Sequence, residues 1–178
     1  MKRLLTIALA ATLLAACKQT GSDTTMIWIE DKPGPSVQGT NIFPTVPDSL
    51  WQALGLTEGV PSSMSCFLMQ TEGEYILFDA GLGAPFSQLL PRLSELGLSP
   101  ADIPYIYITH MHGDHIGGLI SDGAPVFPNA ELYVNRLEAE AWLSMPDDRG
   151  AQAQAVLEAY SGHVHLFEGG EVLQLGVK

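Results

Sequence analysis

The stretch YIYITHMHGDHIGG, residues 105–118, constrains the fold more than any other part of the sequence. Its first five residues form the continuous apolar run expected of a strand buried on both faces. Three of the chain's five histidines and one aspartate follow within six positions, at His110, His112, Asp114 and His115. Any fold of this chain therefore carries a buried strand whose end gathers several ionisable side chains in a small volume.

The spacing inside this cluster suits a metal site. Residues two apart in an extended segment point to the same side, so His110 and His112 can reach one point. Gly113 permits a sharp turn, and Asp114 and His115 follow it at once. The alternative is that these side chains are structural. That alternative has to account for all four groups at once, and it is unfavourable because charged imidazoles repel one another and buried neutral ones need hydrogen-bond partners. The pattern favours metal coordination.

The N-terminal segment, residues 1–16, has the pattern of a secretory signal peptide. Lys2 and Arg3 precede an apolar run that ends in small residues directly before Cys17. The segment resembles a bacterial lipoprotein signal, which implies that Cys17 becomes the lipidated first residue. A transmembrane helix is the alternative, although the run is short for a bilayer. We expect export and a lipid anchor on the periplasmic or cell-surface side of a bacterial membrane, with residues 17–25 as a polar tether.

The composition of the chain without residues 1–16 excludes some classes of binding partner. Loss of Lys2 and Arg3 with the signal leaves 6 of the 8 basic residues against 20 acidic ones, a formal net charge of −14. The acids are scattered, as on a solvated surface, and their charge repels nucleic acid and anionic headgroups. With Cys17 lipidated, Cys66 has no cysteine partner, so a core rather than a disulfide has to stabilise the fold. We expect a small-molecule substrate, no nucleic acid, and membrane contact only through the lipid.

Strand and helix patterns alternate from residue 26 onward. Strands are predicted over residues 26–30, 64–70, 74–80, 105–109 and 131–135, the second and third forming a hairpin. Helices are predicted over residues 85–96, with Gly97 as a C-terminal cap, and over 136–143 and 149–160. Residues 31–48 are expected to be a long loop, and 163–167 with 171–175 a closing hairpin. This order predicts an α/β layered fold.

The segment HMHGDH, residues 110–115, resembles the His-x-His-x-Asp-His signature of the metallo-β-lactamase superfamily. FDAGLG, residues 78–83, is similar to that family's Asp-x-Gly strand end, and the order of hairpin, Asp-x-Gly, helix, strand and histidine motif also agrees. FPNAELYVNRLEAEAWL, residues 127–143, looks like the lactonase and organophosphate-hydrolase branch. The resemblance spans residues 63–178 and implies the αββα fold of that superfamily.

The resemblance implies a site for two divalent metal ions, with zinc as the expected metal. In the family pattern His110 and His112 bind the first ion, and Asp114 and His115 bind the second. The ions share a bridging hydroxide, and Asp114 is the expected catalytic residue because it would hold this nucleophile and accept its proton. Asp79 has two interpretations, which stay open: it orients a ligand histidine or the turn, or it caps the end of its strand.

The family pattern also calls for ligands beyond these four. It takes a third histidine for the first ion, an aspartate that bridges both ions, and a last histidine for the second. Their strand ends would follow Lys178, so we expect residues 26–178 to be the N-terminal portion of a longer domain, truncated to its first αβ half and inactive by itself. His163 and His165 are interpreted as strand residues, because the family pattern has no ligand there.

These patterns together predict a metal-dependent hydrolase that acts through a metal-bound hydroxide on a small ester, lactone, amide or phosphoester. A β-lactamase proper is the enzymatic alternative, because the same motif allows it. A surface lipoprotein that binds metal without catalysis is the alternative from another class.

Overall fold

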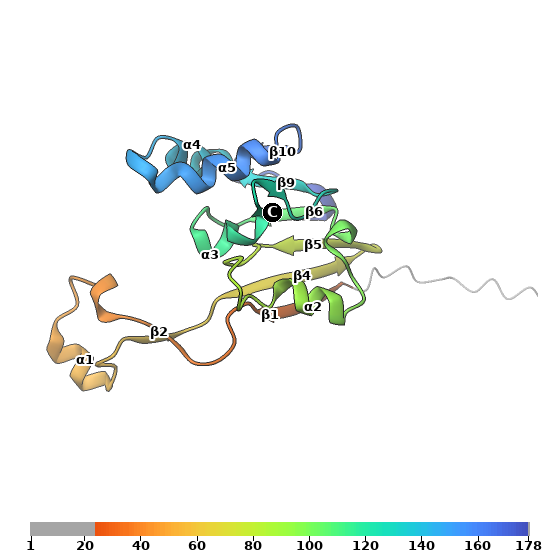
Figure 1. Cartoon of the computed structure of the whole chain (residues 1–178). Coiled ribbons are helices and arrows are strands. Elements are labelled where there is room, and N and C mark those ends of the chain that lie inside the picture. The colour runs from red at the N-terminus through yellow and green to blue at the C-terminus, as the bar shows by residue number, and fades with distance from the viewer. Residues whose placement is uncertain (1–23, 178) are drawn as a thin grey trace, which may run out of the picture.

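The computed structural model describes residues 24–177, so the predicted signal peptide and most of the predicted tether lie outside the described residues. Within that range no helix has the length and apolarity needed to cross a membrane. A six-stranded sheet in the order β1-β4-β5-β6-β9-β10 forms the centre of the molecule (Figure 1). Its strands are β1 (Thr25–Glu30), β4 (Ser65–Thr71), β5 (Glu74–Phe78), β6 (Tyr105–Ile108), β9 (Glu131–Asn135) and β10 (Val164–Phe167).

The direction of the strands decides which chain segments can meet. β1, β4 and β5 pair antiparallel, whereas β5, β6, β9 and β10 pair parallel in this order. The carboxyl ends of these four parallel strands therefore lie at one edge of the sheet. The segments that follow β5 and β6, which include Asp79 and His110, are consequently neighbours in space.

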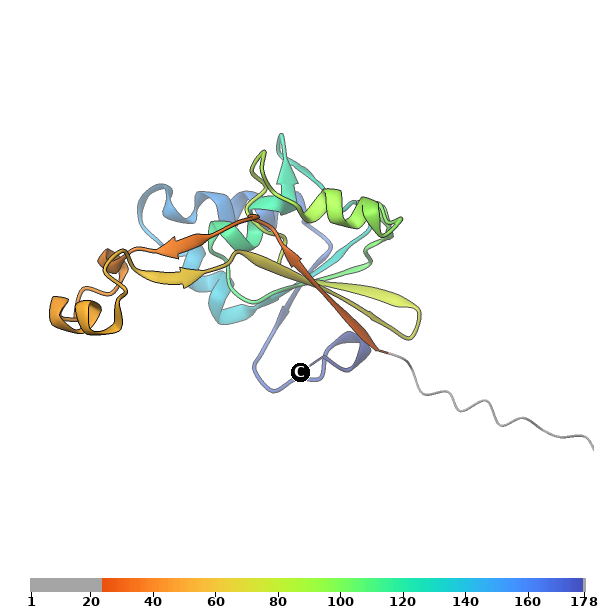
Figure 2. The same ribbon diagram turned by 90° about the horizontal axis from the view of Figure 1, so that it is seen from below.

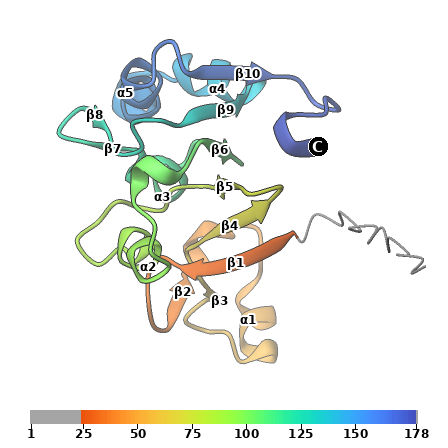
Figure 3. The ribbon, with the colours of Figure 1, turned by 90° about the vertical axis from the view of Figure 1, so that its right-hand side faces the viewer.

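Helices cover one face of the sheet. Figure 3 shows α2 (Leu89–Glu95), α3 (Gly113–Ile116) and α5 (Ala151–Ala159) on this face, with the C-terminal segment on the other. α4 (Arg136–Leu143) packs against α5, β9 and β10. Short elements complete the body: η2 (Pro100–Asp102), η3 (Gly117–Leu119), β7 (Ile120–Ser121), β8 (Ala124–Pro125), η4 (Asp147–Gly150) and η5 (Gln174–Gly176).

The two faces of the sheet differ because side chains alternate along each strand. Residues that point toward the helices are fully buried, among them Ile29, Leu68, Leu77, Ile106 and Leu132. The opposite face carries an aromatic row across all six strands, made by the directly paired residues Trp28, Phe67, Phe78, Tyr107, Tyr133 and His165. Rings stack along this row, with centroids 4.5 Å apart for Tyr107 and Tyr133.

An arm extends from the body between β1 and β4. It consists of β2 (Ser36–Gln38), η1 (Thr40–Ile42), α1 (Asp48–Leu54) and β3 (Val60–Ser62), and β2 pairs with β3 antiparallel. Figures 1 and 2 show α1 at the far end of this arm, away from the sheet. Trp51 is buried within the arm, and its ring centroid lies 5.7 Å from that of Phe43. The arm thus has a small apolar centre of its own.

The predicted α/β class is confirmed, and three predicted elements need correction. The loop predicted over residues 31–48 contains β2 and η1, and α1 follows it without having been predicted. The helix predicted over residues 85–96, which is α2, begins at Leu89 rather than residue 85, because the Asp31 carboxylate accepts hydrogen bonds from the backbone N–H groups of Gln88 and Leu89. The prediction of a closing hairpin over residues 163–167 and 171–175 is wrong. β10 pairs parallel with β9 instead, and Leu175, in the predicted second strand, has a left-handed φ of 55°.

Candidate metal centre

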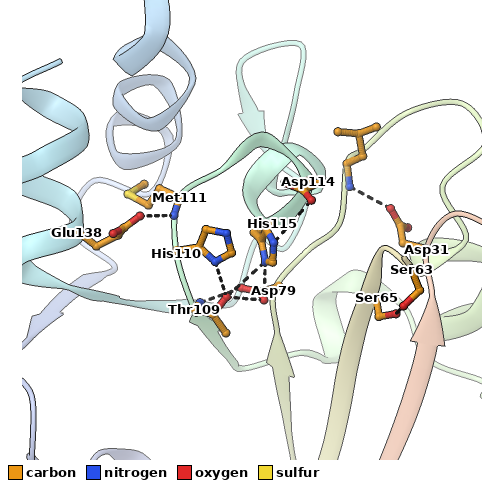
Figure 4. A network of polar contacts seen from close by, with 11 residues as sticks. Asp31, Ser63, Ser65, Asp79, Thr109, His110, Met111, Asp114, His115 and Glu138 are labelled. Atoms are coloured by element: carbon orange, nitrogen blue, oxygen red, sulfur yellow. Dashed lines mark hydrogen bonds and ion pairs between the residues drawn. The ribbon is translucent and has the colours of Figure 1, made fainter. Parts of the chain in front are cut away.

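The site lies at the carboxyl edge of β5 and β6, where Asp79 and Thr109 directly follow the two strands (Figure 4). Asp79 has a φ of 61°, which is uncommon for a residue with a side chain. Its Oδ1 accepts from the backbone N–H of Thr109 at 2.8 Å, and its Oδ2 accepts from the Thr109 hydroxyl at 2.8 Å. The carboxylate therefore caps the end of the neighbouring strand β6, whereas the interpretation of Asp79 as a cap placed it at the end of its own strand.

Asp79 also contacts the histidine cluster. The Nδ1 of His115 lies 2.8 Å from Asp79 Oδ2, and this carboxylate is almost fully buried (Figure 4). A hydrogen bond from Nδ1 to a carboxylate fixes the ring orientation and leaves Nε2 available for a ligand bond. The second interpretation of Asp79, orientation of a predicted ligand, thus has the contact that it requires.

The four predicted ligand residues lie next to one another. The ring centroid of His110 is 3.8 Å from that of His115 and 4.9 Å from that of His112. Asp114 Oδ2 lies 3.7 Å from His115 Nε2, on the side of the ring away from Asp79. Three imidazoles and one carboxylate therefore share one small volume, as the sequence motif predicted.

The turn that carries these residues packs against backbone without intervening side chains. Ala80 N–H donates to the carbonyl of His115 at 2.7 Å, and Gly118 N–H donates to the carbonyl of Gly81 at 3.1 Å. A Cβ on Gly117 would lie 2.2 Å from the Leu82 carbonyl oxygen, and one on Gly118 would lie 2.0 Å from that of Ala80. The two glycines thus permit the close approach of these two backbone segments.

Gly113 has a different role from the predicted one. It opens α3 and is not among the residues with positive φ, so no sharp turn depends on its freedom. A Cβ at this position would instead lie 3.0 Å from the side-chain oxygen of Gln152 on α5. The turn of the chain is made by α3 itself, which begins directly after His112.

The pKa values of His110 and His115 are shifted in opposite directions. Burial lowers the pKa of His110 below its ordinary value, and the neighbouring His115 and His112 lower it further. The hydrogen bond that His115 donates to Asp79 raises the pKa of His115, against the opposing effect of burial. A neutral imidazole has a lone pair for a metal, and a carboxylate partner makes a metal-bound imidazole a stronger donor.

The donor set fits a divalent cation by its chemistry. Imidazole nitrogens and carboxylate oxygens are ligands that zinc accepts. Among residues 24–177 no group of three histidine, cysteine, aspartate or glutamate side chains converges on a single point. The residues thus match a metal site in type and proximity.

Two residues of the site escaped the sequence analysis. Glu138 on α4 accepts with Oε1 from the backbone N–H of Met111 at 2.8 Å and from Trp142 Nε1 at 2.7 Å. The Trp142 ring meets the His112 ring edge-on, with centroids 5.1 Å apart. Their spacing of four on a helix was visible in RLEAEAWL, but nothing in the sequence indicated which turn this helix would face.

The remaining two histidines lie at the opposite end of the parallel strands. His165 is in β10 and His163 directly precedes it, so the prediction of strand residues is confirmed for His165. His163 Nδ1 lies 3.0 Å from Glu131 Oε1, and His165 Nε2 lies 2.6 Å from Glu131 Oε2. These side chains pair with Glu131 at the start of β9 and do not join the cluster.

The fold and the site together define a class of protein: a layered α/β protein with a histidine-rich site at the carboxyl ends of parallel strands. The family model of the metallo-beta-lactamase superfamily matches residues 59–171, a range that includes both sequence motifs. The chain belongs to the metallo-beta-lactamase superfamily. The predicted resemblance is thereby confirmed at the level of the superfamily.

Curated relatives match parts of the chain. A ribonuclease Z from Salinibacter ruber is 41% identical over 69 residues, which cover 37% of this chain and 20% of the relative. An N-acyl homoserine lactonase from Bacillus thuringiensis is 34% identical over 101 residues, which cover 44% of this chain and 38% of the relative. The matches span well under half the length of these relatives, and they include more than one activity.

Solved structures match most of the chain. A hydrolase of the beta lactamase superfamily, AbOPH, has a TM-score of 0.70 at 25% identity, over 88% of this chain and 61% of its own. AidC, described as a dizinc quorum-quenching lactonase, has a TM-score of 0.73 at 21% identity, over 86% of this chain and 61% of its own. The likeness to AidC shows the fold alone, and both matches cover less than two thirds of the solved chains.

Proposed function

We propose that the chain carries the metal-binding edge of a hydrolase that acts on a small ester, lactone, amide or phosphoester. The observation that carries the proposal is the cluster after β6, where three imidazoles and a carboxylate adjoin within one small volume. Membership of the superfamily supports it. The N-acyl homoserine lactonase among the relatives favours a small substrate over a polymer.

Each residue has a defined task in this proposal. His110 and His112 would hold one divalent ion, and Asp114 and His115 a second, with zinc as the expected metal. When bound, such ions lower the pKa of water and polarise the oxygen of the scissile bond. The Asp114 carboxylate, 3.7 Å from His115 Nε2, would accept the proton that the water gives up. Asp79 holds the His115 ring through Nδ1.

The negative charge of the chain bears on the class of substrate. The net charge of −14 without residues 1–16 disfavours a polyanion such as RNA, although a ribonuclease Z is among the relatives. We therefore propose a small-molecule substrate and no nucleic-acid partner. Lipid attachment at Cys17, with export across a membrane, remains part of the proposal. Mass spectrometry of the N-terminal peptide from the native host tests this part, and an unmodified Cys17 in a soluble protein would exclude it.

Metal content and turnover of the full gene product test the function. We expect divalent metal to copurify, and His112→Ala and His115→Ala each to lower its stoichiometry. His163→Ala is the matched control, because this histidine pairs with Glu131 away from the cluster. Unchanged stoichiometry in both cluster variants would place the metal elsewhere.

The assay then offers lactone, phosphotriester and β-lactam substrates with added zinc or manganese. Lactone or phosphotriester turnover supports the proposal. Turnover of the β-lactam alone indicates a β-lactamase proper. Metal uptake without any turnover indicates the non-catalytic lipoprotein.

A further inference from the structure

α4 forms one wall of the site through two side chains on the same face. Glu138 and Trp142 are four residues apart, and Trp142 Nε1 donates to Glu138 Oε1 at 2.7 Å. The same Oε1 accepts from the backbone N–H of Met111 at 2.8 Å. Met111 is the residue between His110 and His112, so a single oxygen ties the middle of the motif to the helix (Figure 4).

α4 is also held by contacts that do not involve the histidine motif. Asn135 caps α4, because its Oδ1 accepts from the N–H of Leu137 at 3.0 Å. Ala139 follows Glu138 and is buried in the core, so this part of α4 packs against the body of the molecule. The Met111 side chain is also buried, so the motif is held from both sides of its backbone.

We infer that Glu138 and Trp142 are positioning residues for His112. Glu138 fixes the backbone directly before His112, and the Trp142 ring stands edge-on to the imidazole at 5.1 Å with an interplanar angle of 83°. Within the described residues the exposed His112 side chain makes no hydrogen bond, so its ring is placed by the backbone that Glu138 holds and by the rings of His110 and Trp142 on either side. This inference rests on the proposed function, in which His112 binds metal.

The chemistry of the shared oxygen predicts an order of effects. A carboxylate oxygen accepts both donors with charge-assisted bonds. The amide oxygen of Glu138→Gln still has two lone pairs for the same donors, so this variant should keep much of the arrangement. Glu138→Ala removes the acceptor and leaves the N–H groups of Met111 and Trp142 without it. Trp142→Phe keeps a ring beside His112 but removes one donor.

The experiment uses the full gene product in two states. First, the metal-free protein is examined by NMR, with the imidazole resonances of His112 and their cross-relaxation with the Trp142 ring as readouts. Second, cobalt(II) is titrated and followed by its visible absorption bands, which report ligand geometry. Glu140→Ala is the matched control, because Glu140 is exposed on the same helix. Thermal unfolding of each variant establishes that it folds.

We expect Glu138→Ala to shift the His112 resonances, to weaken cobalt affinity about 10- to 100-fold and to change the absorption bands. The cobalt affinity of Glu138→Gln should fall by less than about tenfold, and that of Glu140→Ala should match the wild type. Folded Glu138→Ala protein with wild-type His112 resonances would overturn the inference. If the wild type takes up no cobalt, the proposed function fails, while the metal-free NMR comparison still decides whether Glu138 positions His112.

Discussion

Replacement of Asp31 by asparagine should destabilise the fold although it changes a single atom. Asp31 is fully buried at the end of β1. Its Oδ1 accepts from the N–H groups of Gln88 and Leu89, both at 3.1 Å, and its Oδ2 accepts from Leu82 N–H at 2.9 Å and the Ser87 hydroxyl at 3.0 Å. One carboxylate thus satisfies four donors, three in the segment between β5 and α2 and one at the first residue of α2.

An asparagine can satisfy only part of this set. With its oxygen in the place of Oδ1, its NH₂ group faces the Leu82 N–H, while the Ser87 hydroxyl can turn and accept. A buried donor without a partner costs about 1–3 kcal/mol, and two charge-assisted bonds become weaker neutral ones. The neutral amide is less costly to bury than a charge, which offsets some of this loss. We expect about 2 kcal/mol of destabilisation, which lowers Tm by roughly 4–8 °C.

Urea denaturation followed by circular dichroism measures the effect. The midpoint should fall while the slope m stays constant, because the surface exposed on unfolding is unchanged. Asp148→Asn is the matched control, since Asp148 is exposed. A free energy of unfolding for Asp31→Asn within about 0.5 kcal/mol of the wild type would refute the reasoning, because such a value is typical of surface changes without a defined role.

Three further outcomes follow from single contacts. Gly118→Ala places a Cβ 2.0 Å from a backbone oxygen and should cost about 3 kcal/mol in urea denaturation, whereas Gly169→Ala, which meets nothing within 4 Å, should not. Tyr160→Phe removes a buried hydroxyl that donates to the Leu119 carbonyl at 3.0 Å, and should cost about 1–3 kcal/mol in the same assay. Glu131→Gln should cost less than about 1 kcal/mol. Hydrogen bonds from the two paired histidines hold the pKa of Glu131 below its ordinary 4.5, so that cost should be present above pH 4.5 and fade below it in unfolding curves measured from pH 6 to 3.5.

Local patterns in the sequence were sufficient wherever one segment determines its own structure. ELYVN and RLEAEAWL have the predicted bounds as β9 and α4, because strand alternation and helix periodicity are properties of short segments. The cluster was predictable for the same reason. His110, His112, Asp114 and His115 are so close in the chain that β6 followed by a short helix brings them together in almost any fold.

Contacts between distant segments were not predictable in this way. Asp31 stands in a stretch rich in proline and glycine, and its four donors lie more than fifty residues away, so it resembled an ordinary loop aspartate. The partner of β10 was mistaken because HVHLF and EVLQL are adjacent in sequence, as hairpin strands usually are. Parallel pairing with β9 depends instead on α5 returning the chain across the sheet.

These distant contacts determine whether the motif can act as a site. Asp79 holds the His115 ring from the end of β5, and Glu138 holds Met111 from α4. Asp31 fixes Leu82, whose segment lies against Gly117 and Gly118. Two carboxylates thus fasten the motif directly, one at the end of β5 and one on α4, and Asp31 fixes the backbone segment that packs against the glycines after it. Each of these contacts is made by a carboxylate outside the motif, which accepts from backbone or ring N–H groups. The motif transplanted alone onto another strand end would therefore keep its metal-ligand side chains but lose the contacts that hold them in place.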